Sequence, residues 1–128
     1  MLATDPRDRL IVALDLPLAR ALEVARSIRG RAGWVKVGMT TFYESGPEAV
    51  AAMRELGFKV FLDLKLFDIP HQVEGAARAA ALTGADMLTI HASGGAEMAA
   101  AARRGADDGS SDGSRMALLG VTVLTSMD

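Results

Sequence analysis

The chain alternates short apolar segments with alanine-rich segments of helical period, and this alternation limits the choice of fold more than any other feature. Runs of apolar and β-branched residues predict strands. We expect strands at Leu10–Leu14, Trp34–Val37, Lys59–Lys65, Asp86–His91 and Ala117–Leu124. Their first residues are roughly 24 to 31 positions apart, and a (β/α)8 barrel of about 250 residues uses about 31 per unit.

Four helices are expected between these strands. They are expected at Leu18–Ile28, Ser45–Gly57, Pro70–Leu82 and from Gly95 to about Gly105. The segment Ser45–Glu48 has the spacing of a capping box with a proline in the first turn, so Ser45 is predicted to cap the second helix. The segment Gly105–Ser114 is rich in Asp, Gly and Ser, which predicts a solvated loop.

Doubly wound open sheets also alternate strands with helices, so the spacing does not separate them from barrels. The residues at the strand ends favour the barrel. The expected strands finish on polar or ionisable residues: Asp15, Lys36, Asp63 with Lys65, His91, and Thr125 with Ser126. A ring of such groups at the carboxyl ends of the strands is what a barrel active site requires. The sequence therefore predicts an α/β protein with the (β/α)8 TIM-barrel fold.

The 128 residues provide only about the first four βα units of such a barrel, followed by strand five. We expect a single partial TIM-barrel domain over residues 1–128, which stops before the second half. A half-barrel leaves unpaired sheet edges and an uncovered apolar face. We therefore expect a truncated gene product or a partial sequence.

The segment Phe61–Pro70 places three charges, Asp63, Lys65 and Asp68, in the most apolar part of the chain. Side chains alternate along a strand, so Asp63 and Lys65 should point to one face of a strand that is buried on both sides. A lysine flanked by two carboxylates stays protonated and can stabilise or protonate a developing carbanion. The alternative is a structural ion pair, with Asp68 capping the helix that begins near Pro70.

Three further ionisable residues follow or end expected strands. Asp15 is equally well explained as the cap of the first helix or as an acceptor for substrate hydroxyl groups. Lys36 lies in an apolar strand and needs a partner, for which Asp63 on the next strand is the obvious candidate. His91 is not expected to be catalytic, because a histidine at a strand end often only bonds the backbone.

The composition excludes several classes of protein. The net charge of −2 is too small and too mixed in sign to predict a nucleic-acid or membrane partner. Without cysteine there is no disulfide, thiolate or cysteine-ligated zinc, and neither a dinucleotide nor an ATP motif occurs. No metal-ligand spacing and no membrane-spanning or signal segment is recognised, so we expect a metal-free cytoplasmic protein.

The pattern Asp63-x-Lys65-x-x-Asp68-Ile69-Pro70 resembles the signature of the orotidine 5′-phosphate decarboxylase family. The resemblance extends, in the same order, to Ile11–Asp15, Val35–Gly38, His91–Gly95 and Val121–Met127. It implies a cofactor-free (β/α)8 homodimer. It also implies the last step of de novo pyrimidine biosynthesis, the decarboxylation of orotidine 5′-monophosphate to uridine 5′-monophosphate.

The resemblance assigns roles to individual residues. Lys65 would donate the proton to C6 of the pyrimidine, and Asp63 would lie against the departing carboxylate. Lys36 would link Asp63 to the ribose, and Asp15 would hold a ribose hydroxyl. Thr125, with Ser126, would contact the base.

A second group of residues is expected to act across the dimer. Asp68 would be contributed to the neighbouring subunit's site, next to Ile69 and Pro70. Gln72 stands where the family usually has a threonine that contacts the partner's ribose, and its amide can still form hydrogen bonds.

Two alternatives to this function stay open. Related sugar-phosphate decarboxylases and aldolases resemble the chain in their Asp-x-Lys-x-x-Asp strand but use magnesium. The other alternative is a non-enzymatic half-barrel. We expect the 128 residues alone to be inactive, because the family's phosphate-binding groups lie in the second half of the barrel.

Overall fold

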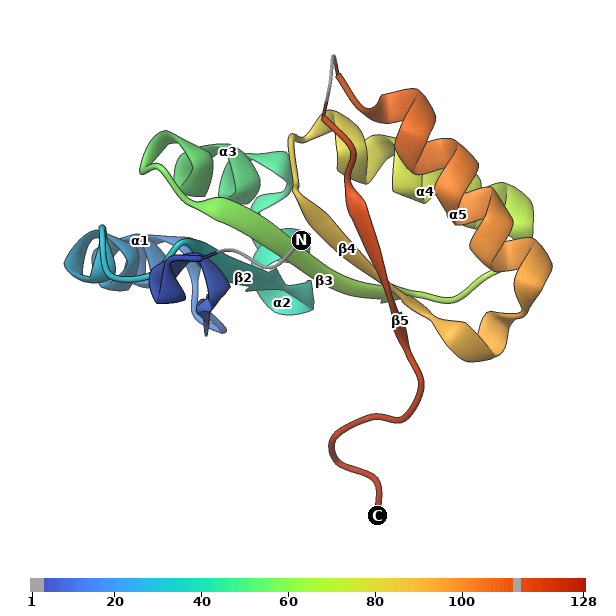
Figure 1. Cartoon of the computed structure of the whole chain (residues 1–128), viewed down its shortest axis with the longest axis horizontal. Helices are drawn as coiled ribbons and strands as arrows, with labels where there is room; N and C mark the ends of the chain where they lie inside the picture. The colour runs from blue at the N-terminus through green and yellow to red at the C-terminus, as the bar shows by residue number, and fades with distance from the viewer. Residues whose placement is uncertain (1–3, 112–113) are drawn as a thin grey trace.

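The computed structural model describes residues 4–111 and 114–128, which form one parallel sheet with helices around it (Figure 1). The strands are β1 Ile11–Ala13, β2 Trp34–Gly38, β3 Lys59–Leu66, β4 Met87–His91 and β5 Ala117–Val121. Each strand pairs with its neighbours in sequence, in the order β1-β2-β3-β4-β5. A doubly wound sheet reverses its order at a switch point, so this sequential order confirms the first half of a (β/α)8 barrel.

The helices lie outside the strands, with α1 and α3 at one side of Figure 1 and α4 with α5 at the other. The α-helices are α1 Leu18–Ile28, α2 Met39–Ser45, α3 Pro47–Glu55, α4 Pro70–Leu82 and α5 Ala96–Gly109. Two short 3-10 helices, η1 Pro6–Arg9 and η2 Ala92–Gly94, precede β1 and α5. In the described residues, no helix combines the length and the apolar character that a membrane crossing needs.

The predicted start of the second helix is wrong. An additional helix, α2, runs directly from the end of β2 to Ser45, so Ser45 ends one helix and does not cap the next. Gly46 occupies the N-cap of α3 with φ 65° and ψ −152°, and no side chain caps that helix. A sharp turn at Gly46 therefore separates the two helices, because glycine adopts positive φ at no steric cost.

The fourth predicted helix is too short, and the fifth predicted strand is too long. Helix α5 continues to Gly109, and β5 ends at Val121. The expected loop Gly105–Ser114 is thus helical in its first half, and part of it falls at 112–113, outside the described residues.

Helix α5 continues through Gly105 and Gly109. The two glycines lie where α4 packs closely against α5. A Cβ atom at Gly105 would collide with the carbonyl group of Glu74, and one at Gly109 with the carbonyl group of Arg78. The same two α4 residues form ion pairs across the contact, Arg104 with Glu74 at 2.7 Å and Arg78 with Asp108 at 2.6 Å. These glycines therefore serve close helix packing.

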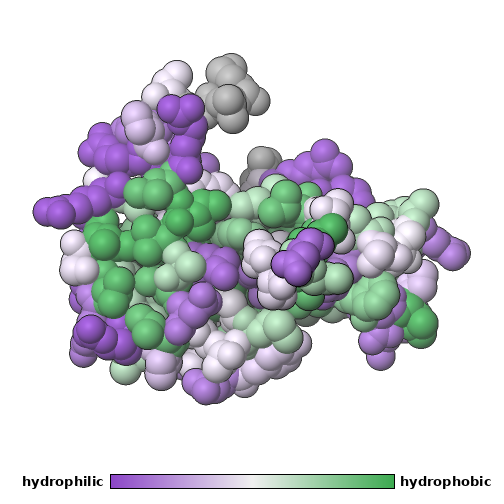
Figure 2. Space-filling model, turned by 90° about the horizontal axis from the view of Figure 1, so that it is seen from below, coloured by the Kyte–Doolittle hydropathy of each residue, from purple (hydrophilic) through white to green (hydrophobic). Residues whose placement is uncertain are grey.

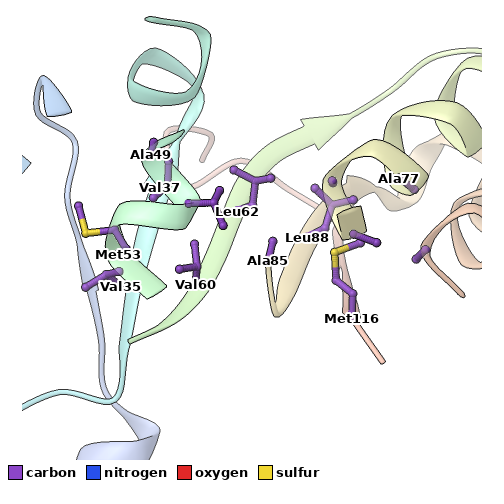
Figure 3. Packing of buried hydrophobic residues seen from close by; sticks show 14 of the residues in the cluster. Val35, Val37, Ala49, Met53, Val60, Leu62, Ala77, Ala85, Leu88 and Met116 are labelled. Atoms are coloured by element: carbon purple, nitrogen blue, oxygen red, sulfur yellow. The ribbon is translucent and has the colours of Figure 1, made fainter. Parts of the chain in front are cut away.

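The core lies between the sheet and its helices (Figure 3). Branched side chains from the central strands pack against small or flexible side chains from the helices, which include Ala49, Met53 and Ala77. The strand residues of this cluster are Val35, Val37, Val60, Leu62 and Leu88, each at most 1% exposed. Burial of such apolar surface is the main source of folding free energy.

The edge strands leave apolar side chains in solvent. In the described residues β1 and β5 each pair on one side only. Leu10, Ile11 and Leu119 on or beside these strands are at least one-third exposed, and Figure 2 shows a continuous hydrophobic area on one face of the molecule. The predicted open edges and uncovered apolar surface are therefore present.

We predict opposite effects when a methyl group is added to two helical glycines. Gly105→Ala should lower the free energy of unfolding by about 1–3 kcal/mol, because the new Cβ forces α5 away from Glu74. Gly75→Ala in α4 is the matched control: its Cβ meets nothing within 4 Å, and it should raise stability by about 0.5–1 kcal/mol. Denaturant titration measures both changes; equal stability of the two variants would contradict the packing described for α5.

Candidate active site

Asp63 lies at the centre of a line of alternating charges at the carboxyl ends of the strands. The Lys65 ammonium group donates to both of its oxygens at 2.9 Å. The Lys36 ammonium group is 3.5 Å from Oδ2 of Asp63 and 3.6 Å from Oδ1 of Asp15. The predicted pairing of Lys36 with Asp63 is therefore present, and Asp63 and Lys65 share a face as expected.

Parallel register brings these residues together from three strands. Gly38 at the end of β2 is opposite Asp63 on β3, and Asp15 follows β1, which pairs with β2. A Cβ atom at Gly38 would lie 3.0 Å from Oδ1 of Asp15. Gly38 therefore leaves the space in which Asp15 approaches Lys36.

The strand is not buried on both faces throughout. Asp63 is 8% exposed, but Leu64, Lys65 and Leu66 are only partly buried. In the intact sheet of a parallel barrel both faces are covered. Lys59 is exposed and Phe61 is also only partly buried, so the expectation of a strand buried on both faces is correct only for Val60, Leu62 and Asp63.

Several influences act on the pKa of Asp63. Burial is the largest, and it raises the pKa because it disfavours the charged carboxylate. Hydrogen bonds from Lys65 and Thr89 and the charges of Lys65 and Lys36 act in the opposite direction. Together they hold the pKa of Asp63 below its usual value, so the carboxylate is charged at neutral pH.

Asp68 does not flank Lys65 within this chain. Its side chain is exposed, and Oδ1 accepts a hydrogen bond from the backbone N–H of Ile69 at 2.7 Å. In the described residues Asp63 is the carboxylate that pairs with the Lys65 ammonium group, so the lysine is not flanked by two carboxylates. The capping alternative is also wrong, because Ile69 is the N-cap of α4 and no side chain caps that helix.

Asp15 does not cap α1 either, since Pro17 is the N-cap and no side chain makes a capping hydrogen bond to this helix. The capping explanation for Asp15 is therefore wrong. Its carboxylate lies 3.6 Å from the Lys36 ammonium group, and its role toward substrate hydroxyl groups stays a prediction. Asp15 lines a hollow of about 290 Å³ together with Lys36, Asp63 and Lys65.

A second hollow, of about 390 Å³, lies on the other side of the same charges. Lys36, Asp63 and Lys65 line it, and so do Thr125 and Ser126 from the segment after β5. The predicted residues Asp15, Lys36, Asp63, Lys65, Thr125 and Ser126 are thus brought to one end of the sheet.

The predicted residues Asp68, Ile69, Pro70 and Gln72 lie apart from these two hollows. Asp68 and Gln72 line a separate hollow of about 480 Å³ that also reaches Lys65 and His91. Ile69 and Pro70 line a further one beside Phe67. The ring of His91 contacts the Phe67 ring edge-on at 5.4 Å between centroids, which gives it a packing role.

Thr89 is a site residue that the sequence analysis did not identify. It is 2% exposed on β4, and its hydroxyl group donates to Oδ1 of Asp63 at 2.8 Å. The available signal was a hydroxyl residue inside the apolar run Met87–Ile90, since a buried polar group needs a partner. In residues 4–111 and 114–128, no three His, Asp or Glu side chains gather as a metal site would require.

Residues 8–128 match a sequence model described as the Orotidine 5'-phosphate decarboxylase / HUMPS family. The chain belongs to this family. A curated relative, the orotidine 5'-phosphate decarboxylase of Maridesulfovibrio salexigens, is 52% identical over 120 residues, which are 93% of this chain and 52% of that protein. The chain spans about half the length of the curated relatives it matches.

Solved structures of similar fold agree with this assignment. A crystal structure of orotidine 5'-phosphate decarboxylase from Lactobacillus acidophilus matches with a TM-score of 0.83 and 40% identity, over 95% of this chain and 55% of that one. An uncharacterized conserved protein from Geobacillus kaustophilus matches with a TM-score of 0.86 and 45% identity, over 92% and 56%. The resemblance of the charged strand to the decarboxylase family is therefore confirmed.

We predict that Asp63 makes stability depend on pH in acid. The pKa of Asp63 is lower in the folded than in the unfolded chain. Its contribution to the free energy of unfolding is therefore complete above the ordinary pKa of 3.8 and is lost as pH falls through the folded pKa. Asp63→Asn should flatten the rise of unfolding free energy with pH in the acid range around and below 3.8, the ordinary pKa of an aspartate.

Lys65→Met should flatten the same pH dependence, because it removes the hydrogen bonds and the charge that lower the pKa of Asp63. Denaturant titrations at a series of pH values measure the slopes. A slope in both variants as steep as in the wild type would contradict the ion pair.

Proposed function

We propose that this protein acts in the decarboxylation of orotidine 5′-monophosphate to uridine 5′-monophosphate, with Lys65 as the proton donor. The observation that carries the proposal is the ammonium group of Lys65, held by both oxygens of the buried Asp63 carboxylate. Membership of the decarboxylase family and the names of its relatives support it.

The chemistry follows from these two charges. When the bond between C6 of the pyrimidine and its carboxylate breaks, the electron pair stays on C6. The Lys65 ammonium group stabilises this charge and then transfers a proton to C6, which forms the new C–H bond. A nearby Asp63 carboxylate repels the substrate carboxylate before it leaves as carbon dioxide, and Lys65 regains its proton from solvent.

The hollows on either side of the charges accommodate the rest of the nucleotide in this proposal. Asp15 and Lys36 contact the ribose, and Thr125 and Ser126 contact the base. Each of these side chains lines a hollow that Asp63 and Lys65 also line. The reaction is proposed to need no cofactor, since the proton donor and the charged groups come from the chain itself.

The proposed active form is a homodimer in which Asp68 reaches the partner's site. Asp68 is exposed, and the neighbouring side chains of Phe67 and Ile69 are each 64% exposed. Large exposed apolar residues around a charged one are typical of an interface. Ile69, Pro70 and Gln72 lie on the same segment and are proposed to contact the partner's nucleotide.

The function is tested in a joined barrel, in which this chain is followed by the part of the M. salexigens relative that it does not match. We expect the joined barrel to convert orotidine 5′-monophosphate in the presence of a metal chelator. The 128 residues alone should not, because binding energy from the remote phosphate supports the reaction. Activity that requires magnesium would contradict the cofactor-free mechanism and favour the sugar-phosphate enzymes.

In the joined barrel, Lys65→Ala should lower kcat at least about 100-fold, the loss expected when an oriented group that stabilises the transition state is removed. Lys59→Ala is the matched control, because Lys59 lies at the opposite end of β3 over the Trp34 ring. It should retain wild-type kcat. A Lys65→Ala variant with a tenth or more of wild-type kcat would overturn the proposed role.

The role of Asp68 is tested by mixing subunits. Asp68→Asn and Lys65→Ala joined barrels should each be inactive as homodimers. In an equal mixture with random exchange, about a quarter of the sites combine Lys65 of one subunit with Asp68 of the other. Activity should therefore return to about that fraction. If exchanged mixtures stay inactive, Asp68 does not serve the partner's site.

A further inference from the structure

Strand β3 carries a bulge at the two residues that bear the proposed chemistry. Leu62 pairs with Leu88 and Leu66 pairs with Ile90, so three residues of β3 face the single residue Thr89 on β4. Bulges interrupt the ladder and redirect side chains, and they recur next to active sites. Asp63 and Lys65 are two of the three bulged residues.

The backbone of Lys65 adopts a conformation that side-chain-bearing residues avoid. Its φ is 49°, and Lys65 is the non-glycine residue with positive φ in the described part of the chain. Left-handed conformations are disfavoured for L-residues other than Gly, Asn and Asp. Such a conformation persists only where the surroundings impose it.

Thr89 supplies two hydrogen bonds that impose it. The backbone N–H of Lys65 donates to Oγ1 of Thr89 at 2.8 Å, and the hydroxyl group donates to Oδ1 of Asp63 at 2.8 Å. A hydroxyl group has one proton and two lone pairs, so it makes both bonds at once. The ammonium group of Lys65 closes the ring on the same Asp63 oxygen at 2.9 Å.

We propose that Thr89 is a positioning residue: its buried hydroxyl group fixes the bulge of β3 and, through it, the placement of the Lys65 ammonium group on Asp63. Thr89 is 2% exposed, so water does not replace the hydroxyl group. Only the catalytic consequence of this inference depends on the proposed function. The geometric part concerns the chain itself.

Two substitutions separate the hydroxyl group from the shape of the side chain. Thr89→Val keeps the branched shape and removes both hydrogen bonds, whereas Thr89→Ser keeps the hydroxyl group. Thr41→Val is the control, because Thr41 is equally buried but donates to the backbone carbonyl of Leu16 at 2.7 Å. It removes a buried hydroxyl group that does not contact Asp63.

The first readouts are NMR measurements on the chain and on the joined barrel. In Thr89→Val the titration midpoint of the Asp63 carboxyl carbon should rise, because a hydrogen bond that favours the charged form is lost. Amide exchange of Lys65 should become about tenfold faster, the ratio expected for loss of one hydrogen bond. Thr89→Ser and Thr41→Val should match the wild type in both measurements.

The second readout is kinetic. In the joined barrel Thr89→Val should lower kcat with little change in KM and shift the pH profile of kcat in parallel with the Asp63 titration. Thr89→Ser should restore both. A structural role alone would lower the amount of folded enzyme without moving the pH profile.

Unchanged Asp63 titration and Lys65 exchange in Thr89→Val would overturn the proposal. If Thr89→Val does not fold, Thr89→Ala replaces it. Equal Asp63 titration and equal Lys65 exchange in Thr89→Ala and Thr89→Ser would then overturn the proposal. Fast exchange of the Lys65 amide in the wild type would also overturn it. Expected NMR changes in a joined barrel without turnover would support the positioning role and reject the proposed function.

Discussion

The ion pair between the buried carboxylate of Asp63 and the ammonium group of Lys65 is the interaction on which the site depends. Removal of a carboxylate from water is costly unless charges and hydrogen bonds compensate it. Here Lys65, Lys36 and Thr89 all turn toward Asp63. A side chain that pairs with a buried charge cannot move freely. The pairing with Asp63 therefore fixes the positions of Lys36 and Lys65 at the carboxyl ends of the strands.

The fold places this ion pair where a ligand can reach it. β3 is the central strand of the described sheet, and its carboxyl end has β1 and β2 on one side and β4 and β5 on the other. The two hollows share Lys36, Asp63 and Lys65; residues at or after the ends of β1 and β2 also line one of them, and residues of β4, of β5 and of the segment after β5 also line the other. This arrangement is the usual reason that barrel active sites draw residues from several strand ends.

Much of this could be predicted from the sequence because it depends on local periodicity. Alternation along a strand predicted that Asp63 and Lys65 share a face, although β3 is in fact bulged at these residues. The βα pattern predicted an α/β sheet, and the polar residues at the strand ends favoured the barrel over a doubly wound sheet. The bulge could not be predicted, since it depends on a difference in length between paired segments of β3 and β4. The hydroxyl group of Thr89 inside an apolar run signals a buried partner, but which partner it has depends on the bulge opposite it.

Other errors arose where packing decides the local structure. A glycine such as Gly105 is a typical signal for the end of a helix. Here it lies inside α5, where the absence of a side chain allows close contact with Glu74 of α4. Helix α2 has no capping signal, because it follows directly from the end of β2. The charge of Asp68 is conspicuous in the sequence, yet in the described chain it neither pairs with Lys65 nor caps α4, and it accepts a hydrogen bond from the backbone N–H of Ile69.

The most direct test of the proposed site is an experimental structure of the joined barrel with a nucleotide whose pyrimidine carries an anionic group at C6. The ammonium group of Lys65 should lie within about 3 Å of that group, hydrogen-bonded to it, and should keep its contact with Asp63. The ribose should lie beside Asp15 and Lys36. A nucleotide bound away from Lys65, or a Lys65 side chain turned away from Asp63 and the pyrimidine, would contradict the account.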